Sequence, residues 1–149
     1  MITDRLTTFC SAVALNTGAA GTYNVGDLIN MEDLRDIGQG NPLYLVITVS
    51  TTATSGGSAT GQFRLVSDAT STISTTTATV HAVSAAHAVA DMVAGFSVFV
   101  IALPQEGTVY EQYLGIQQIT GTAAFTAGNI DAFLTMDVAA WKAYADASN

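Results

Sequence analysis

The chain has 149 residues, of which 49% are hydrophobic and only 11% are charged, and its formal net charge at pH 7 is -8. This length suits one domain with its own core, and the charged share is far below the roughly 25% of an ordinary soluble domain. Four cations against twelve carboxylates exclude a nucleic-acid partner, because such binding depends on Lys and Arg neutralising phosphates.

The N-terminal part is predicted to hold a short arm, residues 1–9, and a small strand at Thr22–Val25. Polar residues interrupt the apolar side chains of the arm, so we expect no signal peptide there. Cys10 is the only cysteine, which rules out an intramolecular disulfide and favours a small buried side chain. Asp27–Ile37 mixes aliphatic and acidic residues and is predicted to be a solvated loop.

The segment Leu43–Ser50 is predicted to be the central strand of the fold. Aliphatic side chains occupy every second position from Leu43 to Val49, which is typical of a strand with one fully buried face. The next alternating segment, Ala59–Asp68, is expected to pair antiparallel with it through a hairpin connection at Thr52–Thr60. Ala69–Thr79 is almost all Ser, Thr and Ala and is predicted to be a loop without packing content.

Two further strands are predicted between residues 80 and 103. Val80–Ala90 favours an edge strand, and Phe96–Leu103 is apolar on both faces, which predicts cover by a second sheet or by a partner subunit. The long apolar stretch Ala85–Leu103 contains Asp91 and turn signals, so we expect strands rather than a membrane span.

Beyond residue 107, the predicted strands are Tyr110–Thr120 and Asn129–Met136. In Tyr110–Thr120 the apolar side chains change face, which indicates a bulge near Gln117. Asn129–Met136 is expected to close the sheet with Met136 facing inward. Val138–Asn149 changes composition and is predicted to be a short helix or an extended arm.

This pattern of about seven to nine short strands without βαβ alternation predicts an all-β domain. The architecture is a two-sheet β-sandwich, jelly roll or barrel, formed by residues 1–149 with arms at about 1–9 and 138–149.

The chemistry-bearing residues do not form a recognisable active site in the sequence. His81 and His87 are six positions apart, which is about 20 Å along a strand and too far to share a metal. The carboxylates Glu106 and Glu111 lack the order of a catalytic or calcium-binding set. We therefore predict no catalytic residues, no cofactor and no metal.

Seven segments together resemble the capsid cement, or decoration, proteins of short-tailed bacteriophages. The likeness runs nearly from end to end, although the Ser/Thr-rich loop carries none of it. The segments are Ile2–Leu6, Gly18–Tyr23, Arg35–Gly38 through Tyr44–Ile47, Phe63–Asp68, Leu103–Gly107, Tyr113–Gly115 and Trp141–Tyr144.

The resemblance implies a jelly-roll domain, a homo-oligomer (dimer or trimer), that attaches to the outside of the phage head and bridges neighbouring major capsid subunits. It implies no membrane partner, and a place on the virion after synthesis in the bacterial cytoplasm. Exposed aromatic and cationic side chains are the usual anchors of such contacts. Our candidates for capsid or subunit contacts are Arg5, Phe99, Trp141, Lys142 and Tyr144.

Two other classes of protein remain open from the sequence. A carbohydrate- or receptor-binding jelly roll of a virion surface would use exposed aromatics flanked by polar groups, and Tyr110–Tyr113 is the candidate cluster. An enzyme would need His81 or His87 in a pocket beside a carboxylate.

Overall fold

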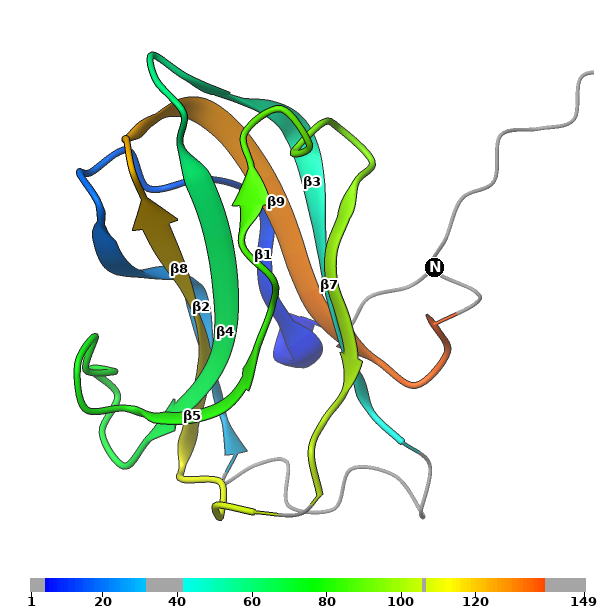
Figure 1. The fold of residues 1–149 in the computed structure, drawn as a ribbon. Coiled ribbons are helices and arrows are strands. Elements are labelled where there is room, and N and C mark those ends of the chain that lie inside the picture. Colours follow the sequence, from blue (N-terminus) through cyan, green and yellow to red (C-terminus); the bar gives the residue numbers. More distant parts are fainter. Residues whose placement is uncertain (1–4, 32–41, 106, 139–149) are drawn as a thin grey trace, which may run out of the picture.

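The computed structural model describes residues 5–31, 42–105 and 107–138, and every structural statement below concerns these residues. They form a short 3-10 helix and nine strands (Figure 1). The elements are η1 (Arg5–Thr7), β1 (Thr8–Ala14), β2 (Gly21–Asn30), β3 (Tyr44–Ser55), β4 (Thr60–Asp68), β5 (Thr79–Val83), β6 (His87–Ala88), β7 (Ser97–Ala102), β8 (Tyr113–Gly121) and β9 (Phe125–Thr135).

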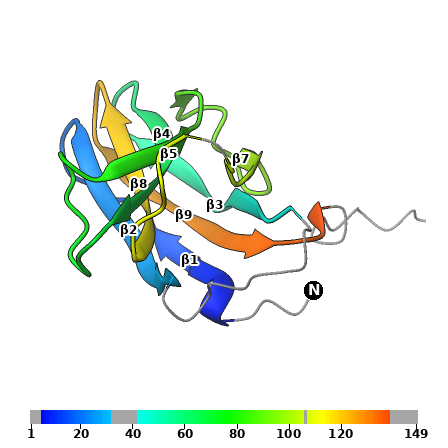
Figure 2. The ribbon, with the colours of Figure 1, turned by 90° about the horizontal axis from the view of Figure 1, so that it is seen from below.

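The strands form two antiparallel sheets that pack face to face (Figure 2). Sheet A has the order β1-β9-β3-β7, and sheet B has the order β2-β8-β4-β5, with the short β6 pairing with β4. When β6 is left out, the first strand pairs with the last, the second with the one before it, and so on inward to the β4–β5 pair. This nested pairing is that of a jelly roll. The prediction of an all-β two-sheet sandwich is confirmed.

Strand β3 lies inside sheet A, between β9 and β7, as its alternating sequence predicted. Leu45 and Ile47 are fully buried and Val49 nearly so, and all three belong to the core between the sheets. Val46 points to the opposite face but is also fully buried, next to its cross-strand neighbour Phe133 of β9. The centre of sheet A is therefore covered on both faces.

The predicted pairing of Ala59–Asp68 with the central strand is wrong. The segment forms β4, which lies in sheet B and pairs with β8, β5 and β6, so the chain crosses between the sheets after Ser55. An alternating pattern shows which face of a strand is buried, but β3 and β4 bury their faces against the same core from opposite sides. The pattern is the same for a neighbour within a sheet and for a strand in the facing sheet.

The β4–β5 loop does pack, contrary to the prediction for Ala69–Thr79. Ile73 is 4% exposed and lies against Gly115 of β8, where an added methyl group would lie only 2.5 Å from Ile73 Cδ1. The glycine thus makes room for the one large aliphatic side chain of the loop. The Asp68 carboxylate accepts hydrogen bonds from the amides of Ser74 and Thr70, which lower its pKa from the usual value.

The bulge predicted near Gln117 is also absent from β8. This strand pairs with β4 without a register shift from Tyr113 to Gly121, so Gln118 and Thr120 face the core. Gln118 is tolerated there because its amide bonds both Asn16 N (2.9 Å) and Asn16 O (3.1 Å) and donates to Thr120 Oγ1. A buried amide with these partners anchors the β1–β2 loop, which removes the need for an apolar residue.

Strand boundaries differ from the prediction at both ends of the chain. β1 begins at Thr8, and Phe9 is fully buried, so the first strand starts within the segment predicted to be an arm. Cys10 is buried as expected, and this burial raises the pKa of its thiol to about 12. Met136, predicted to face inward, follows β9 and is 57% exposed.

The apolar stretch Ala85–Leu103 contains β6 and β7 joined by turns. Met92 in the connection is fully buried and lies against Gly61 of β4. No helix among the described residues is long and apolar enough to cross a membrane.

Candidate functional site

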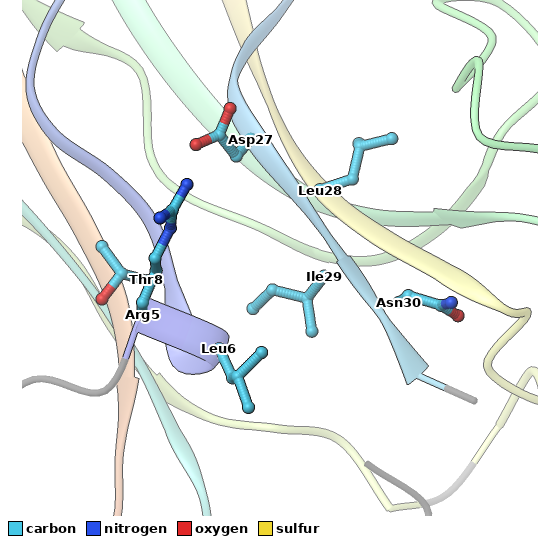
Figure 3. A pocket seen from close by; sticks show the side chains of 7 residues that line it. All are labelled: Arg5, Leu6, Thr8, Asp27, Leu28, Ile29 and Asn30. Carbon is cyan, nitrogen blue, oxygen red and sulfur yellow. The ribbon is translucent and has the colours of Figure 1, made fainter. Parts of the chain in front are cut away.

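A surface hollow of about 390 Å³ lies where the edges of the two sheets meet, beside β1 and β2 (Figure 3). One side is formed by η1 and the start of β1, and the other by the last residues of β2. Ile29 forms an apolar floor and is 4% exposed, whereas Leu6 is 60% exposed and Leu28 37%. The lining residues are Arg5, Leu6, Thr8, Asp27, Leu28, Ile29 and Asn30.

A bulge in β2 creates this hollow. The register between β2 and β8 shifts between Val25 and Ile29, and Gly26 takes a positive φ of 77°. A side chain at Gly26 would meet Phe9 O of β1 at 2.5 Å, so the glycine permits the close approach of the two edge strands. After this kink Asp27 and Leu28 are exposed, and Ile29 returns to the core.

The charged groups of the hollow are Arg5 and Asp27. The Arg5 side chain extends from η1 toward the end of the hollow where Asp27 lies (Figure 3). Within the described residues, Arg5 has no carboxylate at ion-pair distance. A partner placed here would meet a cation, a carboxylate and exposed aliphatic side chains together, which is the mixture found at protein interfaces.

The predicted contact residues are not brought together into one patch. Arg5 is exposed at the hollow, whereas Phe99 lies on β7, the opposite edge of sheet A, where it is half-buried against the core. The remaining three candidates, Trp141, Lys142 and Tyr144, lie outside the described residues. Sequence reasoning selected Arg5 but missed Leu6 and the β2 bulge, whose only sequence signal is Gly26.

A second group of polar side chains lies where β4, β5 and the segment before β8 meet. His81 Nε2 is 2.7 Å from Ser67 Oγ, which also accepts a hydrogen bond from Glu111 N, and Thr79 Oγ1 donates to Glu111 Oε1. Burial lowers the pKa of His81, and the nearby Glu111 carboxylate opposes this effect in part. Ser67 is completely buried, so its hydroxyl cannot meet a substrate, and the group is suited to tying three segments together.

The tyrosines proposed for sugar binding are engaged within the protein. The Tyr110 ring stacks on His81 with ring centroids 3.9 Å apart, and its hydroxyl donates to Pro104 O. Burial also raises the pKa of Tyr110. Tyr113 OH accepts a hydrogen bond from Gln112 Nε2 at 3.3 Å. One face of Tyr110 is thus occupied by an imidazole, which leaves it less suited to stack on a sugar.

The fold and the hollow define a small jelly-roll protein with a mixed polar and apolar interaction surface at one edge and no assembled catalytic group among the described residues. The chain belongs to the Bbp16 family, whose family model matches residues 9–134 and whose name is associated with bacteriophages. The match begins within β1 and ends within β9, so it covers all nine strands except the outermost residue of each of these two. Among curated proteins, none matches this chain.

Proposed function

We propose that this protein is a capsid decoration, or cement, protein of a bacteriophage. It binds the outer surface of the assembled head and stabilises the shell by bridging neighbouring major capsid subunits. It acts there as a homo-oligomer and without catalysis, after synthesis in the host bacterial cytoplasm.

Membership of the Bbp16 family carries this proposal, because the match spans the sandwich and the family name is associated with bacteriophages. The sequence resemblance to cement proteins supplies the specific role. Composition supports it as well, since a surface with few charges costs little to desolvate. Many copies on one shell also turn modest individual contacts into durable attachment.

The hollow beside β1 and β2 is the surface we assign to the capsid contact. Leu6 supplies an exposed aliphatic anchor, and Arg5 beside it supplies a cation for a carboxylate or a main-chain carbonyl of the capsid subunit. Both side chains belong to η1, so one short element presents them to the same partner.

Co-sedimentation with undecorated heads of the phage that encodes the protein tests this assignment. We expect the wild type to pellet with the heads, and the separate variants Arg5→Glu and Leu6→Asp to lose affinity about tenfold or more, as for interface anchors. Val83→Asp is the matched control, because Val83 is 48% exposed on β5 at the far edge of sheet B. It should bind as the wild type does.

Different outcomes separate the parts of the proposal. A folded wild type that stays in the supernatant with undecorated heads contradicts the decoration function. Wild-type binding by both hollow variants contradicts the place of the contact and leaves the function standing. Binding to a glycan array, with none to heads, would instead favour the sugar-binding alternative.

A further inference from the structure

Apart from the two-residue β6, the four edge strands of the sandwich differ in how well they are protected from pairing with another chain. Bulges, charges and short length are the usual protection. β1 has two register shifts and a positive φ at Ala12, and β2 has a bulge and the exposed Asp27. β5 has only five residues and one shift against β4. β7 has six residues and one register shift against β3, between Ile47 and Thr48, but it pairs with β3 without interruption from Tyr44↔Ala102 to Ile47↔Phe99.

The backbone of β7 offers a defined set of free groups at this edge. Leu103 N donates to Leu43 O, so Leu103, Ile101 and Phe99 direct their amides and carbonyls toward β3. Val100 and Ala102 alternate with them and direct theirs to the free edge. Val98 O is already bonded to His87 Nε2 at 3.1 Å, and because a carbonyl can only accept, this nitrogen carries the proton.

The side chains along this edge are uncharged. The segment 97–105 contains no Asp, Glu, Lys or Arg, although the whole chain has a net charge of -8. Val100 is 42% exposed and lies beside Val46 on the outer face of sheet A. A second copy of the same acidic chain can therefore approach β7 without placing like charges opposite each other, and it buries exposed valine.

We propose that β7 pairs antiparallel with β7 of a second copy across a twofold axis at Ile101, which joins two four-stranded sheets into one continuous sheet. In this register Val100 lies opposite Ala102 of the second copy, and the free amides and carbonyls of both residues form four hydrogen bonds. Pro104 lies opposite Val98 of the second copy. A proline has no amide to donate, and Val98 O needs no donor because His87 already supplies one.

Sedimentation of the purified full chain, without heads, tests the proposal independently of the capsid function. We expect the wild type to have twice the chain mass of 15.4 kDa. Val100→Lys and Ala102→Glu should each sediment as single chains, because each places an unpaired charge inside the pairing edge. The double variant Val100→Lys/Ala102→Glu should dimerise again, because the register puts each lysine opposite a glutamate of the second copy.

The controls separate an effect on pairing from an effect on folding. Val83→Lys, on the edge strand β5 of sheet B, should remain dimeric. Circular dichroism should show that the single variants keep their strand content. A wild type that is a single chain at its highest soluble concentration overturns the proposal. So does an oligomer that Val100→Lys leaves intact, and single variants that dissociate without recovery in the double variant overturn the register.

Discussion

A loop covers the outer face of sheet B, whereas the outer face of sheet A is buried at its centre and exposed at the edge strand β7. On sheet B the β4–β5 loop lies across β8, with Ile73 packed against Gly115 and three polar side chains bonded to the loop carbonyls. Those side chains are Asn24, Arg64 and Gln117. On sheet A the exposed Val100 lies on the edge strand β7, where the outward amides and carbonyls of Val100 and Ala102 have no hydrogen-bond partner among the described residues. Polar groups that are already hydrogen-bonded within the chain are not available to bind a partner. We therefore expect interaction surfaces on sheet A and at the β1–β2 edge.

Substitutions on the inner and outer sides of sheet A should differ most in their effect on the free energy of unfolding. Ile47 is completely buried in the core, so Ile47→Asp places a carboxylate where it has neither water nor a counter-ion. We expect a loss of more than about 4 kcal/mol of unfolding free energy, which abolishes folding. Val100→Asp, one strand away but on the exposed side, should cost the single chain less than about 1 kcal/mol.

Circular dichroism and urea unfolding measure both variants. A soluble, cooperatively folded Ile47→Asp protein would show that the buried face of β3 is assigned wrongly. Complete unfolding by Val100→Asp would instead show that the outer face of sheet A belongs to the core, and it would remove the contrast between the two sheets.

Substitutions where the β4–β5 loop packs on sheet B should give the next largest loss of unfolding free energy. Ile73→Ala removes the buried side chain of the loop and should cost about 2 kcal/mol, at the low end for such truncations because a surface loop can settle into the space. Gly115→Ala should cost about 1 to 3 kcal/mol, since its methyl group would meet Ile73 Cδ1. Urea unfolding measures both free energies.

The double variant Ile73→Ala/Gly115→Ala sharpens this prediction. With isoleucine shortened, the new methyl group on residue 115 meets only the flexible end of Leu28, at 3.1 Å, so the combined cost should be clearly smaller than the sum of the two single costs. Strict additivity would mean that the two side chains do not contact each other, and that the loop does not seal sheet B as described.

The sequence predicts the faces of strands better than their neighbours. Alternation in β3 correctly placed Leu45, Ile47 and Val49 in the core, because period two maps directly onto a buried face. It could not show that β4 lies in the other sheet, since both sheets bury the same kind of face. The packing of Ile73 was also beyond prediction, because its partner Gly115 is 42 positions away and carries no side chain to signal the contact.

The candidate site was predicted only through residue type. Arg5 stood out as one of four cations, but the hollow beside it depends on a bulge that a sequence pattern does not reveal. The contact between Ser67 and His81 was not predicted, because Ser67 does not stand out in the sequence. A serine at an inward-facing position merely interrupts the alternation of apolar and polar residues. Its hydrogen-bond partner, His81, lies on a different strand.

The hydrogen bond between His81 and Ser67 at the end of sheet B gives the smallest expected effect on the free energy of unfolding, and this effect depends on pH. Burial lowers the pKa of His81 below its ordinary value of 6.5, so the unfolded chain binds a proton more readily than the folded protein does. The contribution of His81 to stability is therefore present above about pH 6.5 and is lost as the pH falls through that value toward the lower folded pKa. Unfolding free energies measured between pH 7.5 and pH 5.5 should decrease for the wild type.

Two variants test the sign of this linkage. His81→Phe keeps a ring to stack on Tyr110 but cannot titrate, so its stability should change less over the same pH interval. Glu111→Gln removes the carboxylate that partly raises the pKa of His81, so the loss on acidification should become larger than in the wild type. Asp68, whose pKa is lowered from 3.8, acts below this interval and should not interfere. If the unfolding free energy of all three proteins changed equally with pH, the hydrogen bond between Ser67 and His81 would not depend on the charge of the imidazole. The end of sheet B would then be held by packing on Tyr110 alone.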